Sequence, residues 1–312
     1  MRSNWYGILK SFPIRSRMIM QTYSARIASI YLGLFMGIAT VSAQVPDSSR
    51  LSSVYLAGGA FMAADQPLFR GDLSRLAPGS PLLEDDLSDH TFGNDRYYFA
   101  TLGLDISIGL LPFRTADRSG PELRLGLTYA GVMSQGAWLE KTERTPYDTL
   151  TSSQTGQQVF VDSVERSTIW VDRYAERFGI NASLIWRTKG RWSLFGGVGA
   201  VGGPILNART DVSKAVYNGV ENATTNGSNG YGYSGAFGRN DGQESYRNGT
   251  GWWFAGQIPL GLDLQIARRG LFWSQLHLYY ELRPQFLLQN APELGTYSSF
   301  GIQSLFGVRL TL

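Results

Sequence analysis

Residues 250–288 read TGWWFAGQIPLGLDLQIARRGLFWSQLHLYYELRPQFLL, and apolar residues in this stretch recur at every second position. A period of two is that of a β-strand, whose successive side chains point to opposite faces. From Trp252 to Ile266 one face is almost wholly apolar and the other is small or polar, and the pattern resumes from Phe272 to Leu288. The intervening Arg268-Arg269-Gly270 predicts a tight turn between two antiparallel strands.

The same periodicity continues through the chain and predicts eight strands, at 52–62, 96–110, 122–134, 168–187, 191–206, 250–267, 271–288 and 298–312. Their connectors alternate in length. The long ones are 63–95, 135–167 and 207–249, and the very short ones are 188–190 and 268–270. A transmembrane β-barrel of the outer-membrane type has short periplasmic turns and long outer loops, whereas a soluble β-sandwich has no reason to sort its loops by end. The loop pattern therefore favours the barrel over a secreted soluble β-protein.

In this pattern the chain resembles the small eight-stranded bacterial outer-membrane β-barrels, the group that includes the OmpA-type transmembrane domain and the Bacteroidota outer-membrane β-barrel domain proteins. The resemblance covers about residues 50–312 and implies an all-β fold, an eight-stranded antiparallel transmembrane up-and-down barrel with long extracellular loops. It also implies that the barrel assembly machinery recognises the final strand. Leu312 stands where such strands commonly end in an aromatic residue. The apolar face of this strand comprises Phe300, Ile302, Phe306, Val308, Leu310 and Leu312.

The N-terminal region predicts export from the cytoplasm. Basic residues precede an apolar run from Ile27 to Ala39, and small residues follow up to Ala43. This order is typical of a secretory signal peptide, and the run is shorter than the about 20 residues of a membrane-spanning helix. We therefore expect a signal peptide at 1–43 with an over-long start at 1–17, a short periplasmic segment at 44–51 and the barrel at 52–312, located in the bacterial outer membrane.

Charge and cysteine content exclude several classes of function. The formal net charge of +3 includes five basic residues and no acid in 1–43, so the remainder carries 28 − 5 = 23 basic against 25 acidic residues. A nucleic-acid partner is therefore not expected. The chain has no Cys, which excludes disulfides and Cys-ligated metal or iron–sulfur sites. We expect no cofactor, no metal and no catalytic residues.

Two local motifs resemble those of cofactor-binding or catalytic sites. Residues 197–202 fit the pattern G-x-G-x-x-G, but a dinucleotide site needs a helix next, and Gly203-Pro204 follows instead. These glycines predict a strand that allows close approach or strong curvature in a narrow barrel. His277 and Ser274 would be the suspects for a lipid-directed enzyme, but their odd spacing on a predicted strand puts them on opposite faces.

Alternation also predicts a polar network in the barrel lumen. Charges inside a narrow barrel are costly unless they are paired. We expect Asp105, Arg124, Asp263 and Arg309 to form a lower layer and Arg177, Glu281 and Arg283 an upper one, with His277 between them. Such a network would plug the barrel, because eight strands enclose little more than their own side chains.

The sequence thus predicts a non-enzymatic outer-membrane β-barrel with a structural or surface-interaction role. The alternatives are an outer-membrane lipid-modifying enzyme and a narrow transport or secretion-accessory component. Expected partners are outer-membrane lipids, the barrel assembly machinery and an extracellular ligand at the loops 135–167 and 207–249. The second of these loops is rich in Gly, Asn, Ser and Tyr, a composition that also fits a flexible solvated loop.

Overall fold

The computed structural model describes residues 51–312 except 65–66, 85–86, 95–96, 112–120, 152–153, 155, 157, 223–236 and 271. The signal peptide predicted at 1–43 lies outside this range, and so does the periplasmic segment predicted at 44–51 except for Leu51, which begins β1. The strands are β1 (Leu51–Ala64), β2 (Thr91–Asn94), β3 (Tyr97–Leu110), β4 (Glu122–Thr151), β5 (Gln158–Arg187), β6 (Trp192–Asn222), β7 (Phe237–Arg247), β8 (Gly251–Gln257), β9 (Leu260–Gln265), β10 (Leu276–Ala291) and β11 (Gly295–Thr311). The described helices are α2 (Arg70–Leu76) and the 3-10 turn η2 (Pro81–Leu83). None of the described helices has the length and apolar character needed to cross a membrane.

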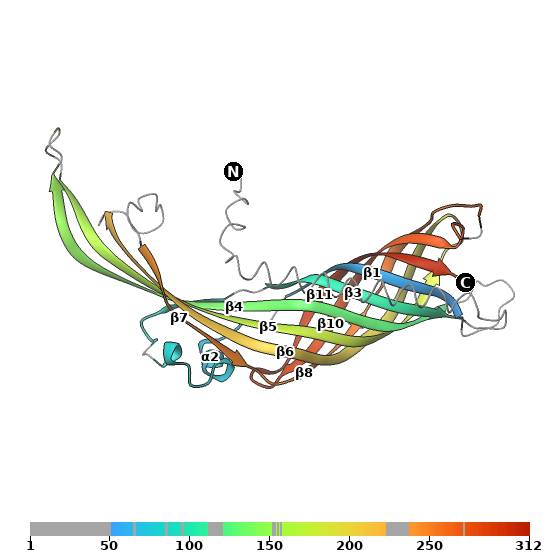
Figure 1. Cartoon of the computed structure of the whole chain (residues 1–312), viewed down its shortest axis with the longest axis horizontal. Coiled ribbons are helices and arrows are strands. Elements are labelled where there is room, and N and C mark those ends of the chain that lie inside the picture. The colour runs from blue at the N-terminus through green and yellow to red at the C-terminus, as the bar shows by residue number, and fades with distance from the viewer. Residues whose placement is uncertain are drawn as a thin grey trace. The chain divides into compact units, whose positions relative to one another are not determined.

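The strands form a closed antiparallel ring (Figure 1). In order around the ring are β1, β3, β4, β5, β6, then β8 with β9, then β10 and β11, which pairs with β1. β8 and β9 occupy one place in the ring and are separated by Ile258 and Pro259, where the proline cannot donate a ladder hydrogen bond. The predicted eight-stranded antiparallel barrel is confirmed.

Glycines allow neighbouring strands of this narrow barrel to approach closely. A Cβ atom on Gly59 of β1 would overlap the backbone carbonyl of Ser304, and one on Gly197 of β6 would overlap that of Leu184. The G-x-G-x-x-G segment at 197–202 lies inside β6, so its predicted role in a strand is confirmed.

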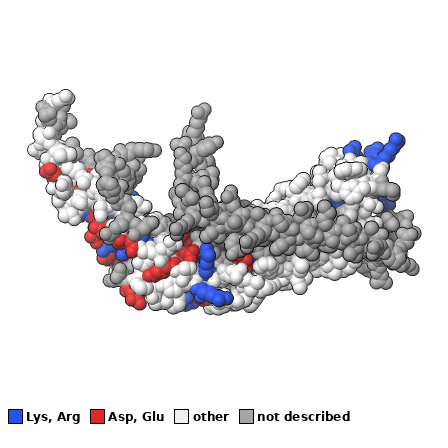
Figure 2. Space-filling model, viewed as in Figure 1, with Lys and Arg blue, Asp and Glu red and all other residues white. Residues whose placement is uncertain are grey.

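The two faces of the barrel wall differ in polarity. Outward side chains are mostly apolar, and the part of the barrel surface visible in Figure 2 is largely uncharged. Trp186, Trp192, Phe272 and Trp273 are exposed near the short turns, where interfacial aromatic residues are expected. On β11, Phe300 and Phe306 belong to this outer face. Other exposed members are Leu127, Phe178, Ile180, Leu194, Val198, Phe254, Ile258, Leu260, Leu262 and Phe286.

β4, β5 and β6 continue well beyond the barrel and, with β7, form an extended sheet (Figure 1). Most of 135–167 and much of 207–249 is therefore strand, and the prediction of loops there was wrong. Those segments continue the strand pairing of the barrel, with Trp138 opposite Trp170 and Tyr217 opposite Arg166. Period-two alternation is harder to see there because both faces contain polar residues.

The first long connector covers one face of the extended sheet. In α2 the backbone N–H of Phe69 donates to Asp72 at 2.8 Å, and the buried Leu73 and Leu76, three residues apart, face the sheet. They pack in a hydrophobic cluster outside the barrel, the outer core. Its buried members are Leu68, Leu73, Leu76, Ala77, Ala137, Leu139, Ile169, Val171 and Val212.

The short turns join strands at the opposite end of the barrel. Gly190 and Gly270 have φ values of 130° and 93°, which L-residues rarely adopt. The strand predicted at 271–288 begins at Leu276, so Ser274 lies in a turn. The expectation that it faces away from His277 on one strand was therefore wrong, although β10 does place His277 inward.

Candidate functional site

All eight residues predicted to line the lumen are buried on the inward face of the barrel. They are Asp105, Arg124, Arg177, Asp263, His277, Glu281, Arg283 and Arg309. Their strands pair in a register that brings most of them within hydrogen-bonding distance of one another. Side chains alternate between the inward and outward faces along each strand, so polar residues at every second position all point into the interior and fill it.

The central cluster comprises Asp105, Arg124, Glu281 and Arg283. Two guanidinium nitrogens of Arg124 donate to the two carboxylate oxygens of Glu281 at 2.7 and 2.6 Å. Arg283 donates to Glu281 at 2.5 Å and to Asp105 at 2.8 Å, so it bridges the two acids. Two cations face two anions, and bidentate geometry of this kind is the strongest form of such a pair.

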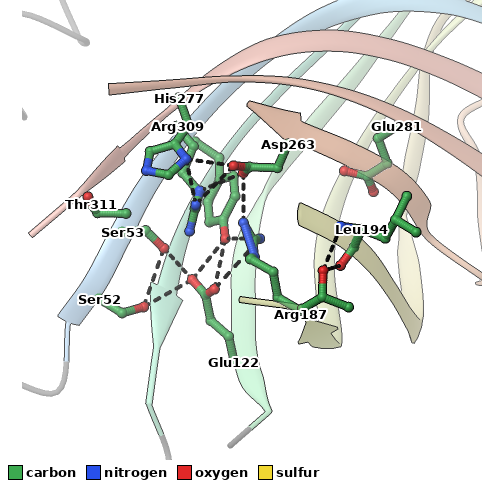
Figure 3. Close-up of polar contacts among 12 residues, drawn as sticks. Ser52, Ser53, Glu122, Arg187, Leu194, Asp263, His277, Glu281, Arg309 and Thr311 are labelled. Atoms are coloured by element: carbon green, nitrogen blue, oxygen red, sulfur yellow. Dashed lines mark hydrogen bonds and ion pairs between the residues drawn. The ribbon is translucent and has the colours of Figure 1, made fainter. Parts of the chain in front are cut away.

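The mouth cluster lies at the end of the barrel where the short turns are, since Arg187 is the last residue of β5. Figure 3 shows its polar contacts. Asp263 accepts hydrogen bonds from Arg187 at 2.7 Å and from Arg309 at 3.2 Å, and its other contact is to Nδ1 of His277 at 2.6 Å. Glu122 completes this cluster and accepts hydrogen bonds from Ser52, Ser53 and Tyr55. Tyr55 also accepts one from Arg187 at 3.0 Å, which joins the two acids.

The composition of the two layers differs from the prediction. Asp105 and Arg124, expected in the lower layer, contact Arg283 and Glu281 of the expected upper layer. The strands tilt and are staggered in a closed barrel, so counting residues from the strand ends does not give height along the axis.

Sequence reasoning missed Glu122 and Arg187, which carry half of the formal charge of the mouth cluster. Both could have been found by alternation, since Glu122 lies two residues from Arg124 and Arg187 lies ten residues from Arg177 on the same strand face. They lie at strand ends, where the limits of a predicted strand are least certain.

Above the central cluster the lumen becomes apolar around one cation. The guanidinium carbon of Arg177 lies 5.5 Å from the ring centre of Phe61 and 5.6 Å from that of Trp253, and Arg177 also donates to Gln289. Phe61, Trp253, Ala175 and Leu287 belong to a hydrophobic cluster that fills this part of the barrel, the inner core. The interior is therefore filled by side chains from the mouth cluster up to Arg177.

The contacts of His277 do not assemble a nucleophile. Its Nδ1 lies 2.6 Å from Asp263 and 3.0 Å from Arg309, and within the described residues no hydroxyl group is bonded to the imidazole. The described part of the chain also contains no cluster of three or more His, Asp or Glu side chains that could hold a metal ion.

His90 lies in the first long connector, outside the barrel and next to Asp89 in the sequence. Partial burial, and then the positive charges of Lys141 and Lys214, lower the pKa of its imidazole below the ordinary value of 6.5. The neighbourhood therefore favours the neutral form of His90, which suits a packed connector better than a charged binding site.

Together, the closed ring, the apolar outer face and the charged, paired interior define a transmembrane β-barrel of the bacterial outer membrane. The described strands close into a ring where β11 pairs with β1, and a closed sheet is the requirement for strands that cross a bilayer.

No protein-family model and no curated protein matches the chain. Among solved structures, it is similar to Ail, the attachment invasion locus protein of Yersinia pestis, both alone and in complex with the heparin analogue sucrose octasulfate. The identities are 8% and 7%, the TM-score is 0.25 for each, and the alignments cover 84% of this chain and 99% of Ail. OmpT of Vibrio cholerae is 13% identical, with a TM-score of 0.11 over 81% of this chain and 76% of that one. The assignment to the outer membrane rests on the barrel itself.

Proposed function

We propose that this chain is a non-enzymatic surface-interaction protein whose barrel anchors the extended sheet outside the cell. The observation that carries this proposal is the extended sheet, which has its own hydrophobic cluster beneath α2 and is therefore an ordered platform. Proteins commonly place binding residues on segments that a rigid scaffold positions.

The tip of the extended sheet has exposed apolar side chains that do not belong to the outer core. Tyr147 is 69% exposed and Phe160 is 55% exposed, and Leu150 and Val220 are also exposed. We refer to these four as the tip residues. The surrounding strands are charged, as Figure 2 shows for the part beyond the barrel, and exposed apolar side chains within a polar rim are typical of protein-binding surfaces.

The filled lumen supports an anchoring role over the alternatives. A transport or secretion-accessory component needs a path through or along the barrel, whereas the central cluster closes the middle of the lumen with paired charges. A lipid-modifying enzyme needs a nucleophile or an activated water beside its base, whereas the contacts of His277 within the described residues are to Asp263 and Arg309.

Other expected partners belong to the same proposal. The outward apolar wall would contact outer-membrane lipids, and the outward face of β11 would be the part that the barrel assembly machinery recognises. Membership of the OmpA-type or Bacteroidota barrel groups remains a prediction from the sequence pattern.

The proposal is tested on intact bacteria that display the full chain. In one variant the tip residues are replaced by Thr, which keeps the tendency to form strands. In the matched control, the exposed Thr145, Thr149, Ser163 and Asn218 are replaced by Ala. Adhesion is measured to protein-coated and polysaccharide-coated surfaces and to cells of the same strain. We expect the tip variant alone to lose adhesion, and equal adhesion by all three proteins would overturn the proposal.

Orientation is checked in the same cells with single cysteines. A membrane-impermeant thiol reagent should label Ser163→Cys on the extended sheet and spare Arg269→Cys in the short turn. Labelling of position 269 alone would place the extended sheet in the periplasm and overturn the surface role.

A further inference from the structure

The inner face of β5 carries an arginine at the level where the barrel gives way to the extended sheet. Arg173 lies directly between Gln135 of β4 and Thr210 of β6 in the strand register. Its neighbours on the same strand face are Ala175, in the inner core, and Val171, in the outer core. A guanidinium group therefore lies between two hydrophobic clusters.

Within the described residues, no side chain is paired with the charge of Arg173. The residue is only 7% exposed, and its Nε and Nη2 atoms are enclosed without a hydrogen-bond partner. In the described part of the chain, no carboxylate oxygen lies within 4.0 Å of it. Burying a cation with unmet hydrogen bonds is costly, so a group that accepts those bonds is expected at this position.

Two described carboxylates, Asp72 of α2 and Glu244 of β7, are bonded to other groups. Asp72 is bonded to Arg75 and to the backbone of Phe69, and Glu244 accepts hydrogen bonds from Ser80 and Tyr246. None of these contacts involves Arg173, so neither of these two carboxylates supplies its counter-charge.

The polar groups beside Arg173 are held in place. The hydroxyl of Thr210 donates to Asn248 at 2.7 Å, and Asn248 in turn donates to the backbone carbonyl of Leu76 at 2.9 Å. A second cation, Arg177, lies four residues along the same strand face, a rise of about 13 Å. At the level of Arg173 itself, the ordered polar layer of Thr210 and Asn248 lies beside a single buried cation.

The two enclosed nitrogens of Arg173 also specify a geometry. The N–H groups of Nε and Nη2 point the same way along one edge of the guanidinium plane, and this edge binds two oxygens of one carboxylate or phosphate. We propose that Arg173 is the anchor of an anion-binding site that takes a phosphate group, with Gln135 and Thr210 beside it. This site goes beyond the proposed surface role, because it lies under α2 and away from the tip residues.

The phosphate group could belong to a free ion or to a sugar phosphate at the cell surface. Titration calorimetry on the full chain, refolded in detergent, uses inorganic phosphate, glucose 6-phosphate and glucose at constant ionic strength with chloride. We expect saturable one-site binding of a phosphate-bearing probe and none of glucose. Tighter binding of the sugar phosphate than of the free ion identifies the ester as the source, and the reverse identifies the ion.

Two variants and a control assign the site. Arg173→Gln removes the charge. Arg173→Lys keeps the charge but lacks the two parallel N–H groups of the guanidinium edge. We expect each variant to weaken phosphate binding by about tenfold or more. The control is Arg209→Gln, at an exposed arginine one residue before Thr210 on β6. Absence of phosphate binding by the unmodified protein would overturn the proposal, whether or not the variants fold. Unchanged binding in a folded Arg173→Gln variant would do the same.

Discussion

At the scale of single residues, the central cluster makes the barrel dependent on complete ion pairs. Arg124 is fully enclosed, and its two hydrogen bonds to Glu281 offset the cost of removing both charges from water. Removing one partner leaves the other charged and buried, which costs far more than the net value of the pair.

We therefore expect Arg124→Ala to lower the free energy of unfolding by about 3–5 kcal/mol. The measurement is urea unfolding of the protein refolded in lipid vesicles, followed by tryptophan fluorescence. The control is Arg268→Ala, at an exposed arginine in a short turn, which should change stability by less than about 0.5 kcal/mol. Similar small effects for both variants would show that the Arg124–Glu281 pair contributes little.

His90 provides a prediction for pH. Since its pKa is lowered on folding, the unfolded segment binds more protons than the folded one just below pH 6.5. The stability contributed by neutral His90 is therefore complete above pH 6.5 and decreases as the pH falls through the window beneath it.

The connector at 67–94 should accordingly be cleaved faster by a protease at about pH 5.5 than at about pH 7.5. The comparison uses a protease whose own rate is calibrated at both values on an unfolded peptide. In His90→Gln the pH effect should disappear. An equal pH effect in that variant would assign the sensitivity to another group.

At the scale of elements, close packing of β1 against β11 closes the ring. Gly59 has no space for a Cβ atom because the carbonyl of Ser304 occupies it, whereas Gly256 on β8 has nothing within 4 Å of that position. Gly59→Ala should lower stability by about 1–3 kcal/mol through forced strand separation, and Gly256→Ala should not. The folded fraction is read from the faster migration of unheated barrel in detergent gels. Equal folded fractions would show that β1 moves aside without cost.

The outward face of the β8–β9 element gives a test of depth in the bilayer. Ile258 is exposed and lies midway between Trp252 and Leu264 on that face. Ile258→Arg should cost about 2–4 kcal/mol if it lies near the midplane, whereas Thr250→Arg, beyond Trp252, should cost about 0–1 kcal/mol. Unfolding in vesicles measures both. A larger loss of stability for Thr250→Arg would show that the bilayer midplane lies nearer to the extended sheet than Ile258 does.

The elements also show what the sequence can predict. Alternation from Trp252 to Ile266 predicted one apolar and one polar face. The structure places Trp252, Phe254 and Leu262 outward and Gln257 inward, because one face meets lipid and the other a polar lumen. The extended sheet was missed because its outer core is covered by α2, a segment distant in sequence, so its strands do not alternate against a single apolar environment. The pairing of Arg283 with Asp105 depends on the stagger between strands, which cannot be deduced from the sequence of any one strand.

At the scale of the whole molecule, the interior is a series of filled layers between two ends of different character. The mouth cluster, the central cluster and the inner core follow one another along the lumen, and the extended sheet with its outer core continues beyond them. A barrel of eight strands has an interior just wide enough for its side chains, so these layers replace a water column.

The protein should therefore conduct no steady current when inserted into a planar bilayer, because an ion would have to displace the paired charges of Asp105, Arg124, Glu281 and Arg283. Insertion is verified independently by protease protection of the same preparation in vesicles. In a matched variant all four of these residues are replaced by Ala, which empties the central layer of the plug without leaving an unpaired charge there. If that variant remains folded, discrete conductance steps should appear only there. Steady, large conductance from the unmodified protein would show that the lumen opens, and would favour a transport role over that of an anchor.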